Sequence, residues 1–349
     1  MKITFVGQAD RGFSTNRIGG SETCFRRLAA ALKIAGHEVD FIVYRQNKRQ
    51  GYFINKGDSR FVDDVGGLKR IITELKTDIV NISPMIIRGE LWKDLLHLKK
   101  NGVRISSIYW MYPVYNGTIV KKIRSAIFNK LVFDKVFGSS PRIINELRRW
   151  GSAAKLLNPP VDDQYYQLGL NRPLKQKIET IGYIGRIGSD KGIEWILSQD
   201  FDELKQRGIR FLLFGYYDPF DSFSVSLHKR LQRHPFIEYH SDNINTELSP
   251  ISGILVDWLQ QLDAVVFPYI TLSGTIDIPL LCLEACAAGC RVYSPPVGDL
   301  KTVLKEQIIF FRHHQRLIDI MDMSKNTYLK PLNNIYSSHF IAHKFISTM

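Results

Sequence analysis

The sequence predicts an α/β protein with two doubly wound parallel sheets. Short apolar runs typical of buried strands alternate with stretches whose apolar residues recur at helical spacing. The alternation stops at Asn158-Pro159-Pro160, which continues neither a helix nor a strand, and then restarts. The chain has 349 residues, a length that favours two domains. We therefore expect two Rossmann-like domains, one on each side of this break.

In the first half, helices should cover both faces of one sheet. Phe25, Leu28 and Leu32 recur at three- and four-residue spacing and predict the first long helix. A later helix should begin after Ser139-Ser140, because serine caps the free amide groups of a helix start. The expected strands are 2–6, 39–44, 78–82, 103–109 and 135–137, and the expected helices are 21–35, 68–75, 91–100, 119–130 and 141–150.

The linker should comprise residues 158–163 and the polar stretch 169–177 that follows. Beyond it we expect strands at 180–184, 210–214, 236–239, 264–268 and 291–293, and helices at 192–197, 251–261, 279–288 and 300–305. The predicted domains are 1–160, 161–330 and a weakly helical tail, 331–349, that packs back on the first domain. Two such domains should face each other across a cleft at the carboxyl ends of their strands, where this class of fold binds ligands.

Composition narrows the classes of function. No apolar stretch approaches the ~18 residues of a membrane span, and the opening residues do not resemble a signal peptide, so we expect a cytoplasmic protein. The net charge is +13, and residues 1–155 hold 28 basic and 13 acidic side chains against 19 and 21 in the remainder. This excess predicts an anionic partner for the first half. The favoured partner is the anionic inner face of the membrane, to which the protein would bind peripherally. Nucleic acid is the less favoured partner.

A metal or a dinucleotide cofactor is not expected. Cys282, Cys286 and Cys290 recur every four residues, which is more typical of small buried side chains on one helix face than of ligands. The pair Asp200 and Asp202 should lie at the end of a polar helix, on the surface. No Gly-x-Gly-x-x-Gly follows the first strand, which argues against a nicotinamide or flavin cofactor.

The segment from Gly185 to Gly192 carries the chemistry. It places Arg186 and Lys191 at a glycine-rich turn between a strand and a helix. Arginine presents a planar fork and lysine a point charge, and both suit a diphosphate. Together with the carboxylate of Glu284, they suggest a site for a nucleotide-diphosphate sugar. When the glycosyl bond of such a donor breaks, negative charge grows on the leaving diphosphate, so these cations would stabilise the transition state.

Three further elements complete the predicted site. Gly19-Gly20 opens the first long helix and could cradle a phosphate or a sugar. Gly274 and Thr275 precede the helix of Glu284, where their amide groups would bind phosphate. Glu284 lies in an apolar helix and therefore needs a partner. Ribose hydroxyls are the favoured partner, and a structural ion pair is the alternative.

These motifs together resemble the GT-B glycosyltransferases, specifically the retaining family four. The resemblance extends from Met1 to about Lys305 and rests on Gly19-Gly20-Ser21-Glu22, Asn158-Pro159-Pro160-Val161-Asp162, Gly185-Arg186 with Lys191-Gly192, and Leu283-Glu284-Ala285 with Gly289. It implies a hexosyltransferase-like enzyme that uses a UDP- or GDP-sugar as co-substrate and retains the anomeric configuration. The resemblance also implies that the second domain binds the donor and the first domain binds the acceptor. The acceptor would be a lipid phosphate, a glycan or a protein.

The sequence departs from the family pattern at two places. Eight residues before Glu284 the family has a glutamate that contacts the donor sugar, and here that residue is Ile276. Asp277 is the nearest carboxylate and is predicted to substitute for it. The family histidine after the fourth strand of the first domain is also missing from Tyr109-Trp110-Met111. A degenerate nucleotide- or glycan-binding protein, a nucleotide-sugar epimerase and a DNA-modifying transferase therefore remain alternatives.

Overall fold

The structure is a computed structural model, and it describes residues 1–8, 20–44, 59–62, 65–84, 91–113, 126–127, 130–172, 177–243, 251–272, 275–325, 327 and 329–349. The chain forms two compact units. The first contains Met1–Pro160, Thr275–Asp277 and Asn334–Met349, and the second contains Val161–Gly274 and Ile278–Asn333. Three residues from late in the chain, 275–277, thus belong to the first unit.

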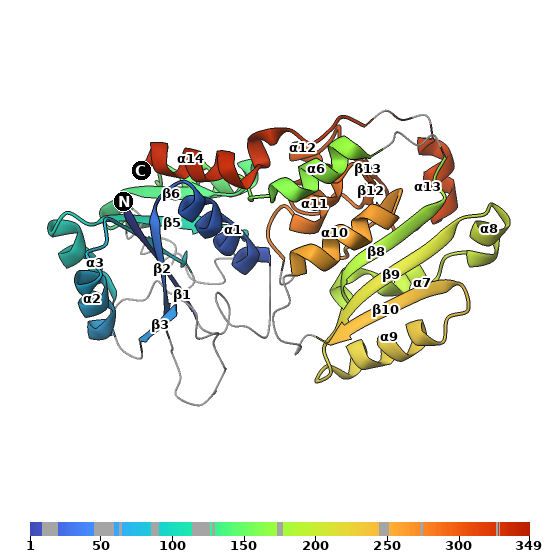
Figure 1. The fold of residues 1–349 in the computed structure, drawn as a ribbon, viewed down its shortest axis with the longest axis horizontal. Helices are drawn as coiled ribbons and strands as arrows, with labels where there is room; N and C mark the ends of the chain where they lie inside the picture. Colours follow the sequence, from blue (N-terminus) through green and yellow to red (C-terminus); the bar gives the residue numbers. More distant parts are fainter. Residues whose placement is uncertain are drawn as a thin grey trace. The chain divides into compact units, whose positions relative to one another are not determined.

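The first unit is a parallel sheet with helices on both faces (Figure 1). Its described strands lie in the order β3-β2-β1-β4-β5-β6-β7. The strands are β1 Lys2–Gln8, β2 Glu38–Tyr44, β3 Ser59–Val62, β4 Ile79–Ile82, β5 Arg104–Tyr109, β6 Lys135–Gly138 and β7 Lys155–Leu156. The helices are α1 Gly20–Ile34, α2 Val65–Glu74, α3 Leu91–Lys100, α5 Pro141–Arg149 and α14 Ser338–Thr348.

Alternation along β1 explains the two covered faces, because neighbouring side chains of a strand point to opposite sides. Phe5 contacts the rings of Phe25 in α1 and Phe345 in α14. Val6 belongs to the core on the opposite face, with buried residues of α2, α3 and α5. The C-terminal helix α14 also packs along α1. The tail therefore completes one hydrophobic layer of the first unit.

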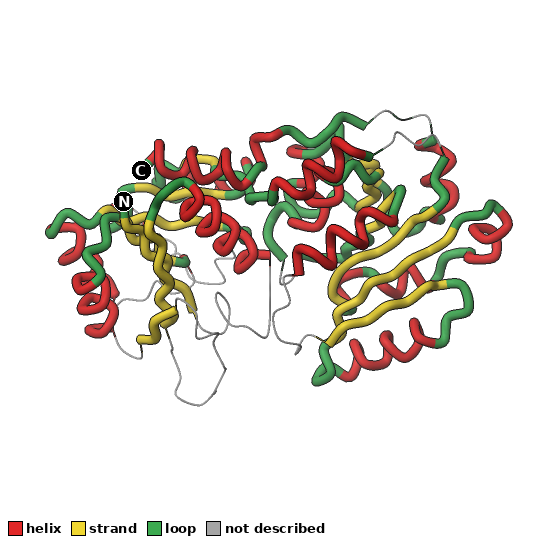
Figure 2. The backbone as a smooth tube through the Cα atoms, in the orientation of Figure 1, coloured by secondary structure: helices red, strands yellow, loops and turns green. Residues whose placement is uncertain are grey.

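The second unit repeats this architecture of a sheet covered by helices (Figure 2). Its strands lie in the order β10-β9-β8-β11-β12-β13 and are again all parallel. The strands are β8 Thr180–Arg186, β9 Arg210–Tyr217, β10 Ile237–Asn243, β11 Ala264–Val266, β12 Arg291–Ser294 and β13 Ile308–Phe310. The helices are α6 Asp163–Asn171, α7 Ile193–Leu197, α8 Phe201–Gln206, α9 Ser222–Gln232, α10 Ile251–Gln261, α11 Leu280–Ala287, α12 Leu300–Val303 and α13 Leu317–Ser324, with a short 3₁₀ turn at Ser189–Lys191.

Helices again lie on both faces of this sheet. Phe211 and Phe214 are three residues apart in β9 and therefore point to opposite sides. Phe211 meets Phe201 of α8, whereas Phe214 meets Trp258 of α10. Helices α10 and α11 both pack on α6. The predicted fold class, α/β with two Rossmann-like doubly wound domains, is confirmed for each unit.

Several local predictions were wrong. Asp163 and residues 169–171 were expected to be linker, but they lie in helix α6, where Tyr165 is fully buried. Asp200 does not end a helix; its carboxylate caps the start of α8 by accepting from the amide of Glu203. Strands β3, β7 and β13 and helices α8, α9 and α13 were not predicted. The expected helix at 119–130 lies largely outside the described residues.

Among the described residues, no helix is both long enough and apolar enough to cross a bilayer.

Candidate functional site

The candidate site of the second unit lies where the strand order reverses. Strand β8 pairs with β9 on one side and with β11 on the other, and the chain winds outward from it in both directions. In open parallel sheets, ligands bind beyond the carboxyl ends of the strands at such a switch point. Arg186 is the last residue of β8, and Tyr269 follows the end of β11. These two ends bound the candidate site.

Two glycines shape the turn after β8. Gly185 has φ +145° and Gly192 has φ +73°, conformations that favour glycine. A Cβ atom on Gly192 would lie 1.8 Å from the carbonyl oxygen of Pro268, so the turn packs directly on the segment after β11. A hydrogen bond stabilises the same contact, because the backbone carbonyl of Asp190 accepts from the amide of Ile270 at 3.0 Å.

The two predicted cations lie together. The Arg186 guanidinium and the Lys191 ammonium each lie 2.9 Å from Oδ2 of Asp190. Arg186 is 46% exposed, whereas Lys191 is 7% exposed. Burial lowers the pKa of Lys191, and the hydrogen bond to Asp190 partly offsets this effect. A diphosphate could take the place of the Asp190 carboxylate between these cations.

Tyr269 connects the cations with Glu284. The Lys191 ammonium lies 5.2 Å from the centroid of the Tyr269 ring, a cation–π contact. Burial raises the pKa of the Tyr269 hydroxyl, and the charges of nearby Glu284 and Asp190 raise it further. Glu284 is 2% exposed in the second turn of α11. The structure therefore brings Arg186, Lys191 and Glu284 into one neighbourhood of the second unit.

In the first unit, Ile276 packs against the start of α1. A Cβ atom on Gly20 would lie 3.3 Å from Cγ2 of Ile276, so the two residues are close neighbours. Ile276 is 1% exposed. Ile276 stands where the resemblance would place a glutamate that contacts the sugar. Its buried aliphatic side chain packs against Gly20, the first residue of α1.

The carboxylate of Asp277 is also held in the first unit. It is fully buried, and it accepts a hydrogen bond from the Ser140 hydroxyl at 2.5 Å and a second from the Arg142 guanidinium. The Asp277 amide donates to the carbonyl of Trp110 at 3.0 Å. Ser140 is the N-cap of α5, as predicted, and accepts from the amide of Ile143. These contacts give Asp277 a structural environment that the sequence did not indicate.

The predicted residues are therefore divided between the units. Gly185, Arg186, Lys191 and Glu284 belong to the second unit, and Gly20, Thr275 and Asp277 to the first. Gly19 and Gly274, predicted to bind the donor, lie outside the described residues.

Sequence reasoning missed Asp190, Tyr269, Ser140 and Arg142 as parts of these arrangements. The position of Asp190, four residues after Arg186 and next to Lys191, was the one available signal.

Within the described ranges, no group of three His, Cys, Asp or Glu side chains is placed to hold a metal ion. Cys282, Cys286 and Cys290 are free and buried, and burial raises the pKa of Cys290 to about 11.

No known protein family and no curated protein matches this sequence. Solved structures do match. AviGT4, a glycosyltransferase involved in avilamycin A biosynthesis, has a TM-score of 0.62 at 15% identity, over 99% of this chain and 96% of its own. The catalytic domain of starch synthase IV from Arabidopsis thaliana, bound to ADP and acarbose, scores 0.59 at 10% identity, over 99% and 98%.

An alpha-glucosyltransferase in complex with UDP and a 13-mer DNA scores 0.57 at 14% identity, over 100% of this chain and 95% of its own. These likenesses extend over whole chains, and they show that this chain has the GT-B fold of glycosyltransferases.

Proposed function

We propose that this chain is a glycosyltransferase that moves a hexose from a UDP- or GDP-sugar to an acceptor, with retained anomeric configuration and without a metal ion. One observation supports the proposal most. In a GT-B fold, Arg186 and Lys191 share one carboxylate at the carboxyl end of β8, beside the switch point of the second sheet. Two adjacent cations at this position suit the diphosphate of a nucleotide sugar.

In the proposed reaction, Arg186 and Lys191 bind the diphosphate as it leaves the sugar. Their attraction grows as negative charge develops on the leaving oxygen, so they favour the transition state over bound substrate. Glu284 accepts hydrogen bonds from the two ribose hydroxyls and orients the donor. Donation from the Thr275 backbone amide to phosphate stays a prediction, because Thr275 belongs to the first unit. The leaving phosphate itself accepts the proton of the acceptor hydroxyl.

The role of Asp277 at the sugar stays a prediction. Its bonds to Ser140 and Arg142 favour an indirect part, in which the carboxylate fixes the segment 275–277 and the start of α5. Arg142 is 40% exposed, so its guanidinium retains access to solvent and could contact a ligand.

The direct test is transfer from labelled UDP- and GDP-sugars by the wild type and by Arg186→Ala and Lys191→Ala. Loss of one such stabilising donor typically lowers kcat about 10²- to 10³-fold. Arg233→Ala removes an exposed arginine just after α9 in the same unit and should turn over normally. Turnover by Arg186→Ala equal to that of the wild type would remove its proposed role.

A catalytically degenerate protein that binds nucleotides is the second candidate. Ile276 motivates it, because an aliphatic side chain buried against Gly20 cannot donate or accept a hydrogen bond to a sugar. Calorimetry separates the two candidates. UDP binding that depends on Arg186, without transfer from any donor to any acceptor extract, would favour the degenerate protein.

The acceptor is proposed to be anionic, because residues 1–155 carry the whole basic excess of the chain. A lipid phosphate on an anionic membrane is the first choice. Duplex DNA is the second, and the alpha-glucosyltransferase crystallised with UDP and DNA supports it. Salt-dependent flotation with anionic liposomes, compared with filter binding of duplex DNA, distinguishes the two.

A further inference from the structure

A cationic cavity lies at the amino ends of the strands of the second sheet, whereas Arg186 lies at the carboxyl end of β8. It has a volume of about 280 Å³. Lys177 lies just before β8, Arg207 lies just before β9, and Arg291 begins β12, so the cavity opens at the amino ends of these strands. Strand β8 has seven residues, which at ~3.3 Å per residue place the cavity roughly 20 Å from its carboxyl end. The cavity is therefore separate from the proposed donor site.

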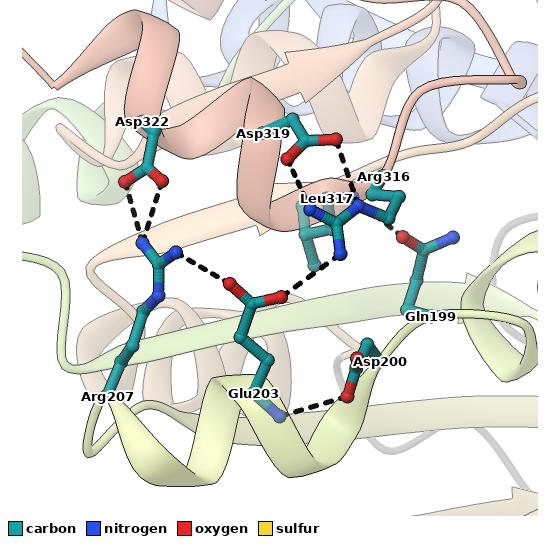
Figure 3. A network of polar contacts seen from close by, with 8 residues as sticks. All are labelled: Gln199, Asp200, Glu203, Arg207, Arg316, Leu317, Asp319 and Asp322. Atoms are coloured by element: carbon teal, nitrogen blue, oxygen red, sulfur yellow. Dashed lines mark hydrogen bonds and ion pairs between the residues drawn. The ribbon is translucent and has the colours of Figure 1, made fainter.

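The charges around this cavity are unbalanced. Four of its lining residues are cations, Lys177, Arg207, Arg291 and Lys325, against one carboxylate, Asp322. Asp322 is already engaged, because both of its oxygens accept from Nη1 of Arg207, at 2.7 and 2.8 Å (Figure 3). Nη2 of Arg207 donates to Oε1 of Glu203.

Neighbouring charges in the same unit are paired. Glu203 also contacts Arg316, which forms a two-bond pair with Asp319 (Figure 3). In contrast, Lys177 and Lys325 form no ion pair within the part of the chain that the structure describes. Arg291 donates to the backbone carbonyl of Ser324 at 3.0 Å, and this contact is neutral. Three cations around one concavity thus keep their charge uncompensated, which raises the positive potential inside it.

The remaining wall of the cavity is aliphatic. Ile318 and Met321 of α13 are 3% and 7% exposed, and Ile178 and Ile209 complete this wall. A small cavity with a cationic rim and an aliphatic wall suits an anion that carries a small apolar group. The volume is at the low end for small-molecule sites, which excludes a whole nucleotide sugar.

We propose that this cavity is a second ligand site, which binds a small phosphate monoester. Lys177, Arg291 and Lys325 would contact the phosphate, and the organic group would lie on Ile318 and Met321. The Arg207–Asp322 pair would fix the position of α13 beside the cavity and contribute no free charge. The site does not depend on the proposed transferase activity.

Calorimetry with phenyl phosphate and with inorganic phosphate tests the site. The protein should carry Arg186→Ala and Lys191→Ala, so that the proposed donor site contributes no binding. In this background we expect phenyl phosphate to bind, and to bind more tightly than inorganic phosphate. Adding Lys177→Ala and Lys325→Ala should weaken binding at least tenfold.

Both lysines are exposed, so their loss should leave the fold intact, which circular dichroism would verify. Lys229→Ala is the matched control, because it removes an exposed lysine from α9 of the same unit. Three results would overturn the proposal: no binding in the Arg186→Ala/Lys191→Ala background, equal affinity for the two phosphates, or unchanged affinity after loss of Lys177 and Lys325.

Discussion

The ammonium of Lys191 and the carboxylate of Asp190 are adjacent in sequence and lie 2.9 Å apart in a largely buried turn. The same carboxylate oxygen binds Arg186. In the free protein, Asp190 therefore neutralises part of the charge that a diphosphate would use. This pairing holds the two cations in place and at the same time competes with the ligand.

We predict that Asp190→Asn binds UDP more tightly than the wild type. Loss of the competing charge should strengthen binding about three- to tenfold, or roughly 1 kcal/mol, as for other partly exposed ion pairs. Calorimetry at two salt concentrations measures it, and the gain should shrink at high salt. Asp202→Asn, an exposed carboxylate in α8, should leave affinity unchanged. Weaker UDP binding by Asp190→Asn would show that its positioning role outweighs its competition.

The pH dependence of UDP binding should reveal Lys191. Burial lowers the pKa of this ammonium below its usual 10.5. Only the charged form attracts phosphate, so UDP affinity should begin to fall at a pH below 10.5 as Lys191 loses its proton. Lys191→Arg stays charged throughout this range and should show no such decline. Calorimetry from pH 7 upward measures the UDP affinity of the wild type and of Lys191→Arg. A parallel decline in both proteins would exclude Lys191 as the titrating group.

The strands and their alternation with helices were predictable, because buried parallel strands are apolar runs that the sequence displays directly. The cation pair was predictable too, since Arg186 and Lys191 flank a glycine turn. Asp190 and Tyr269 were not, because their roles depend on the pairing of β8 with β11. Helix α6 was missed because Asp163 and residues 169–171 resemble a linker, whereas the packing of Tyr165 and the contacts with α11 stabilise a helix.

The anchoring of Asp277 should matter for stability. Arg142→Ala would leave a fully buried carboxylate whose one remaining side-chain donor among the described residues is the Ser140 hydroxyl, which we expect to cost about 2 kcal/mol of unfolding free energy. Arg142→Ala/Asp277→Ala should recover part of this loss, because it removes the stranded charge as well. Arg149→Ala removes an exposed guanidinium from Glu146, which keeps its hydrogen bond from Trp150, and should cost less than about 0.5 kcal/mol. Urea unfolding measures all three, and additive effects of Arg142 and Asp277 would contradict the coupling.

The close contact of Gly192 with Pro268 gives the sharpest stability prediction. In Gly192→Ala, the new methyl group would overlap the Pro268 carbonyl oxygen at 1.8 Å, and alanine would also be strained at φ +73°. We expect a loss of about 3 kcal/mol or more in the free energy of unfolding. Gly208→Ala is a matched control, because Gly208 has φ +70° with no atom within 4 Å of the new Cβ. Gly208→Ala should lose only the cost of placing alanine at a positive φ, about 1 kcal/mol of unfolding free energy. Because the overlap is with backbone, Gly192→Ala must also displace the turn that carries Lys191, so UDP binding should weaken as well. Equal losses of stability in the two variants would mean that the turn does not press on the segment after β11.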